Sequence, residues 1–112
     1  MKRVLEIRTY CLPTGQRETF VNLFHDAALP LLRAWNVDVV GFGVSLEDER
    51  GAYVHLMQAF DSLEARDRDK AAFYGSEAWR GGPHEAIMEC IEACLDTVIE
   101  LEDVQINALR GG

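Results

Sequence analysis

The chain has 112 residues and a mass of 12.6 kDa, which is the size of one domain. Nineteen acidic and eleven basic side chains give it a formal net charge of −8 at pH 7. This acidity argues against partners such as nucleic acids and anionic membranes, because both attract basic protein surfaces. Hydrophobic residues make up 48% of the chain, as is typical of a folded protein, so we expect a single domain over residues 1–112.

The start of the chain and its cysteine content favour the cytoplasm. After the first three residues polar and apolar side chains alternate, so the apolar block of a signal peptide is missing. No apolar run approaches the roughly 18 residues that span a bilayer. Cys11, Cys90 and Cys94 form an odd, small set, unlike the even and dense sets of disulfide-stabilised domains. We predict a cytoplasmic protein with reduced cysteines.

Two of the cysteines lie close together in the sequence. Cys90 and Cys94 are four residues apart in a helical pattern and would therefore face the same way. Cysteine packs as a small hydrophobe, so we predict that both are buried against the sheet. A dithiol or one half of a metal site is the alternative.

The first third of the chain predicts a strand followed by a helix. Residues 4–12 alternate between apolar and polar, which is the period of a strand. Apolar residues then recur at spacings of three and four from Phe20 to Leu31, which predicts an amphipathic helix that starts near Gly15. Pro30 removes a backbone donor, so we expect the helix to kink or end near it.

The middle of the chain predicts a hairpin and a second helix. Residues 37–46 and 52–60 are rich in β-branched and aromatic side chains and are separated by a charged turn ending in glycine, which indicates an antiparallel hairpin. Asp61, with Glu64 three residues later, predicts the cap of a helix that runs to about Tyr74.

The last third predicts a broken helical segment and a final strand. One short helical turn is expected over residues 76–79, before a further helix that opens at 81–83 and extends to about 98. The last strand is predicted over residues 98–107. The order is β-α-β-β-α-β, which predicts an α+β, ferredoxin-like fold with a four-stranded antiparallel sheet and helices on one face.

In the central hairpin, apolar residues occur at both odd and even positions, and therefore on both faces of its strands. In its first strand the apolar residues are Val39, Val40, Phe42, Val44 and Leu46, and in its second they are Val54, Leu56, Met57, Ala59 and Phe60. A sheet with one wet face would alternate cleanly between apolar and polar residues. The chain has enough helix for one face, so we expect a homodimer in which a second subunit covers the other.

Common cofactor and metal motifs are incomplete. The pair Gly41-x-Gly43 lacks the third glycine of a dinucleotide fingerprint, and Glu47 replaces the last glycine of a nucleophile elbow around Ser45. His84-Glu85 lacks the second histidine of a zinc helix. We therefore expect no cofactor and no bound metal.

His55 is the best catalytic candidate, because it interrupts an otherwise apolar strand and a buried imidazole needs a hydrogen-bond partner. A core histidine bonded to a backbone carbonyl explains it equally well. Arg8 and Tyr10 share one face of the first strand, where they could orient an anionic ligand. An ion pair of Arg8 with an acidic residue at a dimer seam is the alternative.

The segment from 62 to 82 has the features of a mobile cover over a pocket between the sheet and the helices. It holds few large apolar residues, and glycines flank the turn that carries Trp79. Trp79 is expected beside the pocket, although a packing anchor is the more common role of such a tryptophan. A solvated helix explains the charge run at 66–70 equally well.

Short motifs spread over residues 6–79 resemble the NIPSNAP family in order and spacing. They are Glu6-Ile7-Arg8-Thr9-Tyr10, Leu29-Pro30-Leu31-Leu32, Val40-Gly41-Phe42, Val54-His55-Leu56, Ser62-Leu63-Glu64-Ala65-Arg66, and Phe73 followed by Ser76-Glu77-Ala78-Trp79. The resemblance implies a dimeric α+β barrel. Neighbouring barrel families include cofactor-free monooxygenases and haem-degrading enzymes that work between sheet and helices. The chain departs from the family where Met57-Gln58-Ala59 replace a frequent Trp-x-Tyr.

These observations lead to two hypotheses. In the first, the protein binds a small organic ligand between sheet and helices, with Arg8, Tyr10, His55 and Trp79 around it. Oxygenation or proton transfer would be the reaction, with His55 as the base. In the second, the protein is a non-catalytic dimeric module that presents an acidic surface to a protein partner. We expect His55 and Tyr10 to converge on one cavity in the first case.

Overall fold

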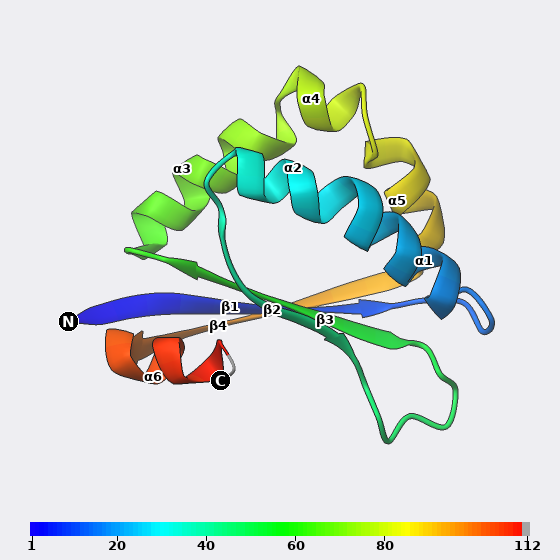
Figure 1. Ribbon diagram of the computed structural model, residues 1–112, viewed down its shortest axis with the longest axis horizontal. Coiled ribbons are helices and arrows are strands. Elements are labelled where there is room, and N and C mark those ends of the chain that lie inside the picture. Colours follow the sequence, from blue (N-terminus) through cyan, green and yellow to red (C-terminus); the bar gives the residue numbers. More distant parts are fainter. Residues whose placement is uncertain (111–112) are drawn as a thin grey trace.

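The sheet is built around the N-terminal strand (Figure 1). The computed structural model describes residues 1–110, which contain four antiparallel strands in the order β2-β3-β1-β4. The strands are β1 (Lys2–Cys11), β2 (Asp38–Val44), β3 (Tyr53–Phe60) and β4 (Ala93–Glu102). The helices that connect them lie on one face, which confirms the predicted α+β, ferredoxin-like arrangement.

The first helical segment runs unbroken past its proline. It consists of α1 (Arg17–Leu23), the π-helical turn η1 (Phe24–Ala28) and α2 (Leu29–Ala34). The backbone N–H of Leu29 donates to the carbonyl of Phe24, five residues back, so the helix widens just before Pro30. Pro30 falls in the first turn of α2, where its missing donor is tolerated. The helix therefore does not end near Pro30 but continues to Ala34, and its irregularity near the proline is the widened turn.

The second helical layer is broken into short pieces. It comprises α3 (Leu63–Tyr74), α4 (Glu77–Arg80) and α5 (His84–Cys90). The predicted helix to Tyr74 and the turn after it are confirmed, but Ser62 rather than Asp61 caps α3, since its Oγ accepts the N–H of Ala65 at 3.0 Å.

The predicted boundary between the last helix and strand is wrong. Helix α5 ends at Cys90, the backbone turns extended at Ile91 (φ −98°, ψ 122°), and Cys94 lies in β4. Cys94 is exposed and Cys90 half-buried, so the two thiols neither share a helix nor lie buried. Residues 90–98 are apolar at both helical and two-sided strand spacings, so periodicity alone favoured the wrong element. The predicted strand tail instead forms α6 (Asp103–Leu109).

The strand register decides which side chains face the helices. Arg8 pairs with Leu56 and Asp96, and these positions share the helix-covered face of the sheet. On that face the core gathers Tyr10 against Phe20 and Phe24, with ring centroids 5.1 and 5.9 Å apart. This aromatic packing fixes the outer half of β1 beneath the first helical segment.

The opposite face is covered in part by α6. Ile106 is fully buried there against Leu5, Val40 and Ala59. Further along the same face, Leu95 is 64% exposed and Ile99 40%. An uncovered apolar area therefore remains on this face of the described chain, as the two-sided pattern predicted. Within residues 1–110, none of the helices has the length and apolar character needed to cross a bilayer.

Candidate ligand-binding site

Arg8, Tyr10 and Trp79 border one small cavity between the sheet and the helices. We call it the Arg8 cavity; its volume is about 30 Å³. Strand β1 positions the arginine and the tyrosine two residues apart on one face, while α4 supplies the tryptophan. Apolar side chains complete the wall: Phe24, Ala28, Leu32, Phe73, Ile87, Met88 and Ile91, together with Tyr74.

The Arg8 guanidinium lies between two aromatic rings. Its central carbon is 5.6 Å from the ring centre of Tyr10 and 5.8 Å from that of Tyr74. Its Nε donates to the Sγ of Cys94 at 3.1 Å and lies 3.6 Å from a carboxylate oxygen of Asp96. The two terminal amino groups have no hydrogen-bond acceptor among residues 1–110. We call this planar guanidinium the Arg8 fork. It is held in place through Nε, while its two terminal amino groups remain free to bind a ligand.

Two tyrosine hydroxyls lie near this fork. Burial raises the pKa of Tyr10 far above its ordinary value of 10, and burial also raises the pKa of Tyr74. Both phenols therefore stay protonated near neutral pH and can donate hydrogen bonds. In the described part of the chain neither hydroxyl has a hydrogen-bond partner, although Tyr10 is 4% exposed.

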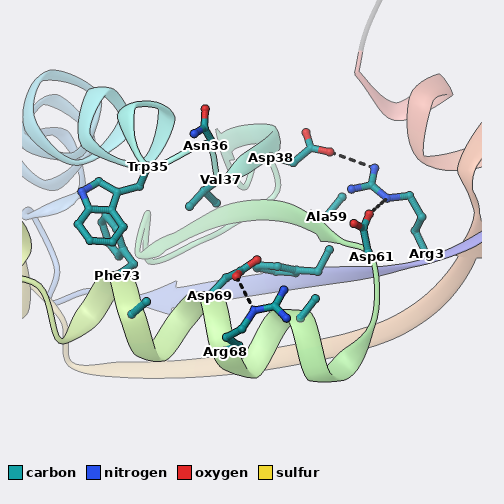
Figure 2. A pocket seen from close by; sticks show the side chains of 13 residues that line it. Arg3, Trp35, Asn36, Val37, Asp38, Ala59, Asp61, Arg68, Asp69 and Phe73 are labelled. Atoms are coloured by element: carbon teal, nitrogen blue, oxygen red, sulfur yellow. Dashed lines mark hydrogen bonds and ion pairs between the residues drawn. The ribbon is translucent and has the colours of Figure 1, made fainter.

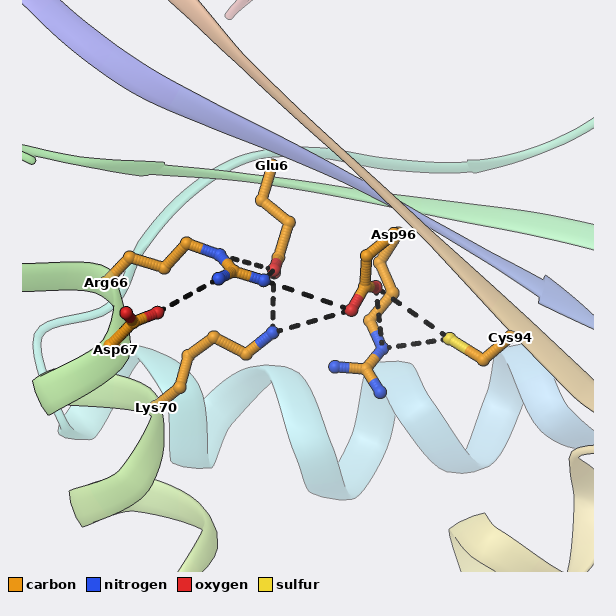
Figure 3. Close-up of polar contacts among 7 residues, drawn as sticks. Glu6, Arg66, Asp67, Lys70, Cys94 and Asp96 are labelled. Carbon is orange, nitrogen blue, oxygen red and sulfur yellow. Dashed lines mark hydrogen bonds and ion pairs between the residues drawn. The ribbon is translucent and has the colours of Figure 1, made fainter. Parts of the chain in front are cut away.

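A buried ion cluster adjoins the fork (Figure 3). Glu6 is completely buried, and its Oε1 accepts hydrogen bonds from Arg66 and from Lys70, the latter at 2.6 Å. Asp96 lies 3.9 Å from both of these cations and 3.6 Å from Arg8. Asp67 also pairs with Arg66, at 3.1 Å, so three cationic side chains share three carboxylates beside the cavity.

The pKa of Glu6 reflects this balance. Burial alone would raise it, but hydrogen bonds and ion pairs with Lys70 and Arg66 outweigh burial and hold the pKa below its ordinary value. Glu6 therefore stays ionised, and its second oxygen, Oε2, has no partner within residues 1–110.

The sequence interpretation missed the role of this cluster. The charge run 66–70 was open to interpretation as a solvated helix face, yet Arg66 and Lys70 point from α3 to the sheet in Figure 3. Their spacing of four residues places them on one side of a helix, and a mid-strand Glu6 was the available sign of a buried partner.

His55 does not join the site. It pairs with Thr9 across β1 and β3, so its side chain lies on the face opposite to Tyr10 and Arg8. The expectation that His55 and Tyr10 converge on one cavity is therefore wrong. The alternative reading of a carbonyl-bonded core histidine is wrong too, since half-buried His55 bonds to hydroxyls, with Thr9 Oγ1 3.0 Å from its Nδ1.

A larger pocket lies along α3, between Ala65 and Phe73 (Figure 2). We call it the α3 pocket; its volume is about 200 Å³, and Trp35 and Phe73 form its apolar end. Its charged residues are paired with one another, since Arg3 contacts Asp38 at 3.0 Å and Asp61 at 3.3 Å. A narrow hollow of about 10 Å³ lies between the α3 pocket and the Arg8 cavity, and Phe73 borders all three.

Solved structures share this fold. An uncharacterized NIPSNAP domain protein from Burkholderia xenovorans is 16% identical, with a TM-score of 0.79 over 89% of this chain and 95% of that one. A NIPSNAP family protein of unknown function from Agrobacterium tumefaciens is 21% identical, with a TM-score of 0.80 over 88% of this chain and 87% of the other.

A more distant likeness is to a putative antibiotic biosynthesis monooxygenase from Bordetella bronchiseptica. It is 16% identical, with a TM-score of 0.63 over 92% of this chain and 98% of that one, and the likeness concerns the fold alone. A search of curated proteins finds no match. The sequence model of the NIPSNAP family matches residues 5–97, so the chain belongs to the NIPSNAP family.

Proposed function

We propose that the protein binds a small organic acid, with the carboxylate on Arg8 and the body of the molecule beneath α3. The observation that supports this is the Arg8 guanidinium, which is fixed between two tyrosine rings and whose terminal amino groups find no acceptor in the described part of the chain. Arginine presents paired donors that match the two oxygens of a carboxylate.

The surroundings suit such a ligand in charge and in shape. The terminal amino groups of Arg8, which have no acceptor within residues 1–110, favour an anion, and Tyr10 offers a protonated hydroxyl. The Arg8 cavity alone holds little more than a water molecule, since a water needs about 10–15 Å³. An organic acid would extend past Phe73 toward the α3 pocket, with α3 and the short helix α4 as the roof that adjusts.

Oxygenation or proton transfer would require a base on this face of the sheet. His55 is on the other face, and Asp96 is the carboxylate beside Arg8. In that reaction Asp96 would accept a proton from the carbon next to the bound carboxylate, and the electron pair of that C–H bond would move onto the carboxylate oxygens, where Arg8 and Tyr10 would stabilise the charge. Oxygen uptake by the protein in the presence of a bound acid is the measurement that separates catalysis from binding.

Titration calorimetry with a panel of small aromatic and aliphatic carboxylates, each paired with its neutral amide, tests the binding. We expect the acids to bind and the amides not to bind. Replacing Arg8→Gln should weaken binding by roughly ten- to a hundredfold, since a charged hydrogen bond contributes about 1.5–3 kcal/mol. Arg8→Lys should recover a part of the affinity, because it keeps the charge and loses the fork.

The matched control is Arg33→Gln. Arg33 is exposed on α2 and borders neither the Arg8 cavity nor the α3 pocket. Its loss should leave the affinity within about twofold. Acids that bind Arg8→Gln as tightly as the original chain would refute the proposed site. A panel in which no acid binds would favour the second hypothesis, the non-catalytic interaction module.

A further inference from the structure

We propose that the ligand is a hydroxy acid, whose carboxylate binds Arg8 and whose hydroxyl donates a hydrogen bond to the side-chain amide of Gln58. This inference rests on the proposed function and adds the residue that selects among acids. Gln58 lies on β3, two residues from Leu56 and therefore on the same helix-covered face, and it is 2% exposed.

Gln58 is a buried polar side chain whose oxygen is unpaired. Among residues 1–110, its Oε1 has no hydrogen-bond partner. Glu6 lies opposite Gln58 in the register, and its Oε2 is unpaired as well, so two neighbouring residues present open acceptors. Buried polar atoms are nearly always hydrogen-bonded, because an unpaired one destabilises the fold. The pair therefore calls for a donor from outside the described chain.

Gln58 borders the narrow hollow that lies between the Arg8 cavity and the α3 pocket. Leu32, Phe73 and Tyr74 line both the hollow and the Arg8 cavity, and Phe73 also lines the α3 pocket. The amide is thus located on the path that an acid would take from the Arg8 fork toward the α3 pocket.

The hollow admits only a small group. Its volume is about 10 Å³, and a single water molecule needs roughly 10–15 Å³. The terminal torsion of a glutamine has a broad minimum, so the amide can turn toward an atom placed in the hollow. A donor with one heavy atom, such as a hydroxyl or an amine, matches this space.

Charge favours the hydroxyl over a charged amine. Lys70 borders the hollow, and Lys70 and Arg66 both reach Glu6 beside it (Figure 3). The hollow's other charged residue, Asp69, pairs with Arg68 at 3.3 Å. An ammonium group would be repelled by the two cations at Glu6, whereas a hydroxyl is neutral and still donates.

The strand order sets the length of the acid. The Arg8 fork leans toward β4, where its Nε donates to Cys94, and Gln58 lies on β3 at the other side of β1. Neighbouring strands are about 4.8 Å apart, so the two ends of the ligand are separated by roughly 5–10 Å. A para-substituted benzene ring with a short acid side chain spans such a distance.

Titration calorimetry with para-hydroxyphenylacetate, phenylacetate and para-methoxyphenylacetate tests the proposal, and the series is repeated with the phenylpropanoates, one methylene longer. We expect the hydroxy acid of at least one series to bind about tenfold more tightly than the acid without the hydroxyl, since it gains a hydrogen bond to a buried acceptor. The methoxy acid cannot donate and should show no gain. Gln58→Met keeps the size of the side chain and should abolish the preference, with the affinity for the unsubstituted acid within about twofold.

Gln16→Met is the matched control. Gln16 is exposed before α1, makes no capping hydrogen bond and borders none of the three spaces, so its loss should leave the preference unchanged. Urea unfolding adds a measurement without ligand: Gln58→Met should be at least as stable as the original chain, because it removes an unpaired buried amide. A large loss of stability would show that the amide is bonded within the fold and would overturn the proposal.

The failure of this inference differs from the failure of the carboxylate site. Acids that need Arg8 but bind equally with and without the hydroxyl would overturn the role of Gln58 and leave the carboxylate site intact, with a bound water as the donor. A hydroxyl preference that persists in Gln58→Met would also overturn it. If no acid binds, both proposals fail together.

Discussion

Glu6 carries a charge into the layer between sheet and helices, and its ion pairs make the fold sensitive to acid. Its folded-state pKa lies below the ordinary value of 4.5. The ion pairs therefore stabilise the fold fully above pH 4.5, and this stability is lost as the pH falls through the folded-state pKa. Protonation takes away the nearest carboxylate of Arg66 and Lys70 and leaves Asp96, 3.9 Å from each, as the one they share.

Replacing Glu6→Gln tests this role. We expect a loss of about 3–5 kcal/mol in the free energy of unfolding at pH 7, because two largely buried cations lose their counter-charge. Urea unfolding at pH 7 and again below pH 4.5 should show the difference from the original chain shrinking with acid. Asp67→Asn is the control: this side chain is 72% exposed and should contribute within about 0.5 kcal/mol. A variant as stable as the original chain at pH 7 would contradict the assigned role.

His55 shows why a site on a sheet is hard to predict from one sequence. Residues in a strand alternate between faces, and a shift of one residue in register exchanges them. Nothing in the sequence states whether Thr9 or Tyr10 lies opposite His55, and the structure pairs it with Thr9. Arg8 and Tyr10 could be grouped correctly because both belong to one strand at a spacing of two.

At the scale of elements, the β2–β3 turn depends on one backbone conformation. Gly51 has φ +60°, in the left-handed region that side chains disfavour, and it follows the turn held by Asp48. Gly51→Ala should therefore lower the free energy of unfolding by about 1–2 kcal/mol. Gly43→Ala in the adjoining strand is the matched control, since a Cβ there meets open space and should be neutral. Thermal unfolding of both variants distinguishes them, and equal melting temperatures would be the contrary result.

The elements also show what patterning can and cannot predict. The first strand and the hairpin were predicted closely, because a period of two and a glycine turn have few other solutions. The end of α5 could not be placed, since Cys90, Ile91 and Cys94 fit a helix stripe and an exposed strand equally well. The burial of Arg66 depends on a carboxylate sixty residues away, which no local pattern reports.

At the scale of the whole molecule, we propose that a second copy of the chain covers the open sheet face beside α6. The face carries exposed Leu95 and Ile99, and the two-sided apolar hairpin predicts a partner there. Sedimentation should give twice the 12.6 kDa mass at micromolar concentration. Ile99→Glu should shift the protein to monomer, because a charge would enter an apolar interface.

The control for this variant is Leu63→Glu. Leu63 is 57% exposed and begins α3 on the helix side, away from the proposed interface. It should leave the mass unchanged. A stable monomer in the original chain would end the proposal of a strand-built dimer.

The central place of β1 also has a consequence for how the chain folds. Its neighbour β3 lies about fifty residues along the sequence and its other neighbour, β4, about ninety, so the sheet closes through distant contacts. Such topologies fold slowly, since a long loop must be ordered before its contacts form. During synthesis β1 must wait for the last strand to leave the ribosome. Until then the edge of β1 that pairs with β4 has no partner, and Glu6, Arg66 and Lys70 lack the neighbouring carboxylate of Asp96.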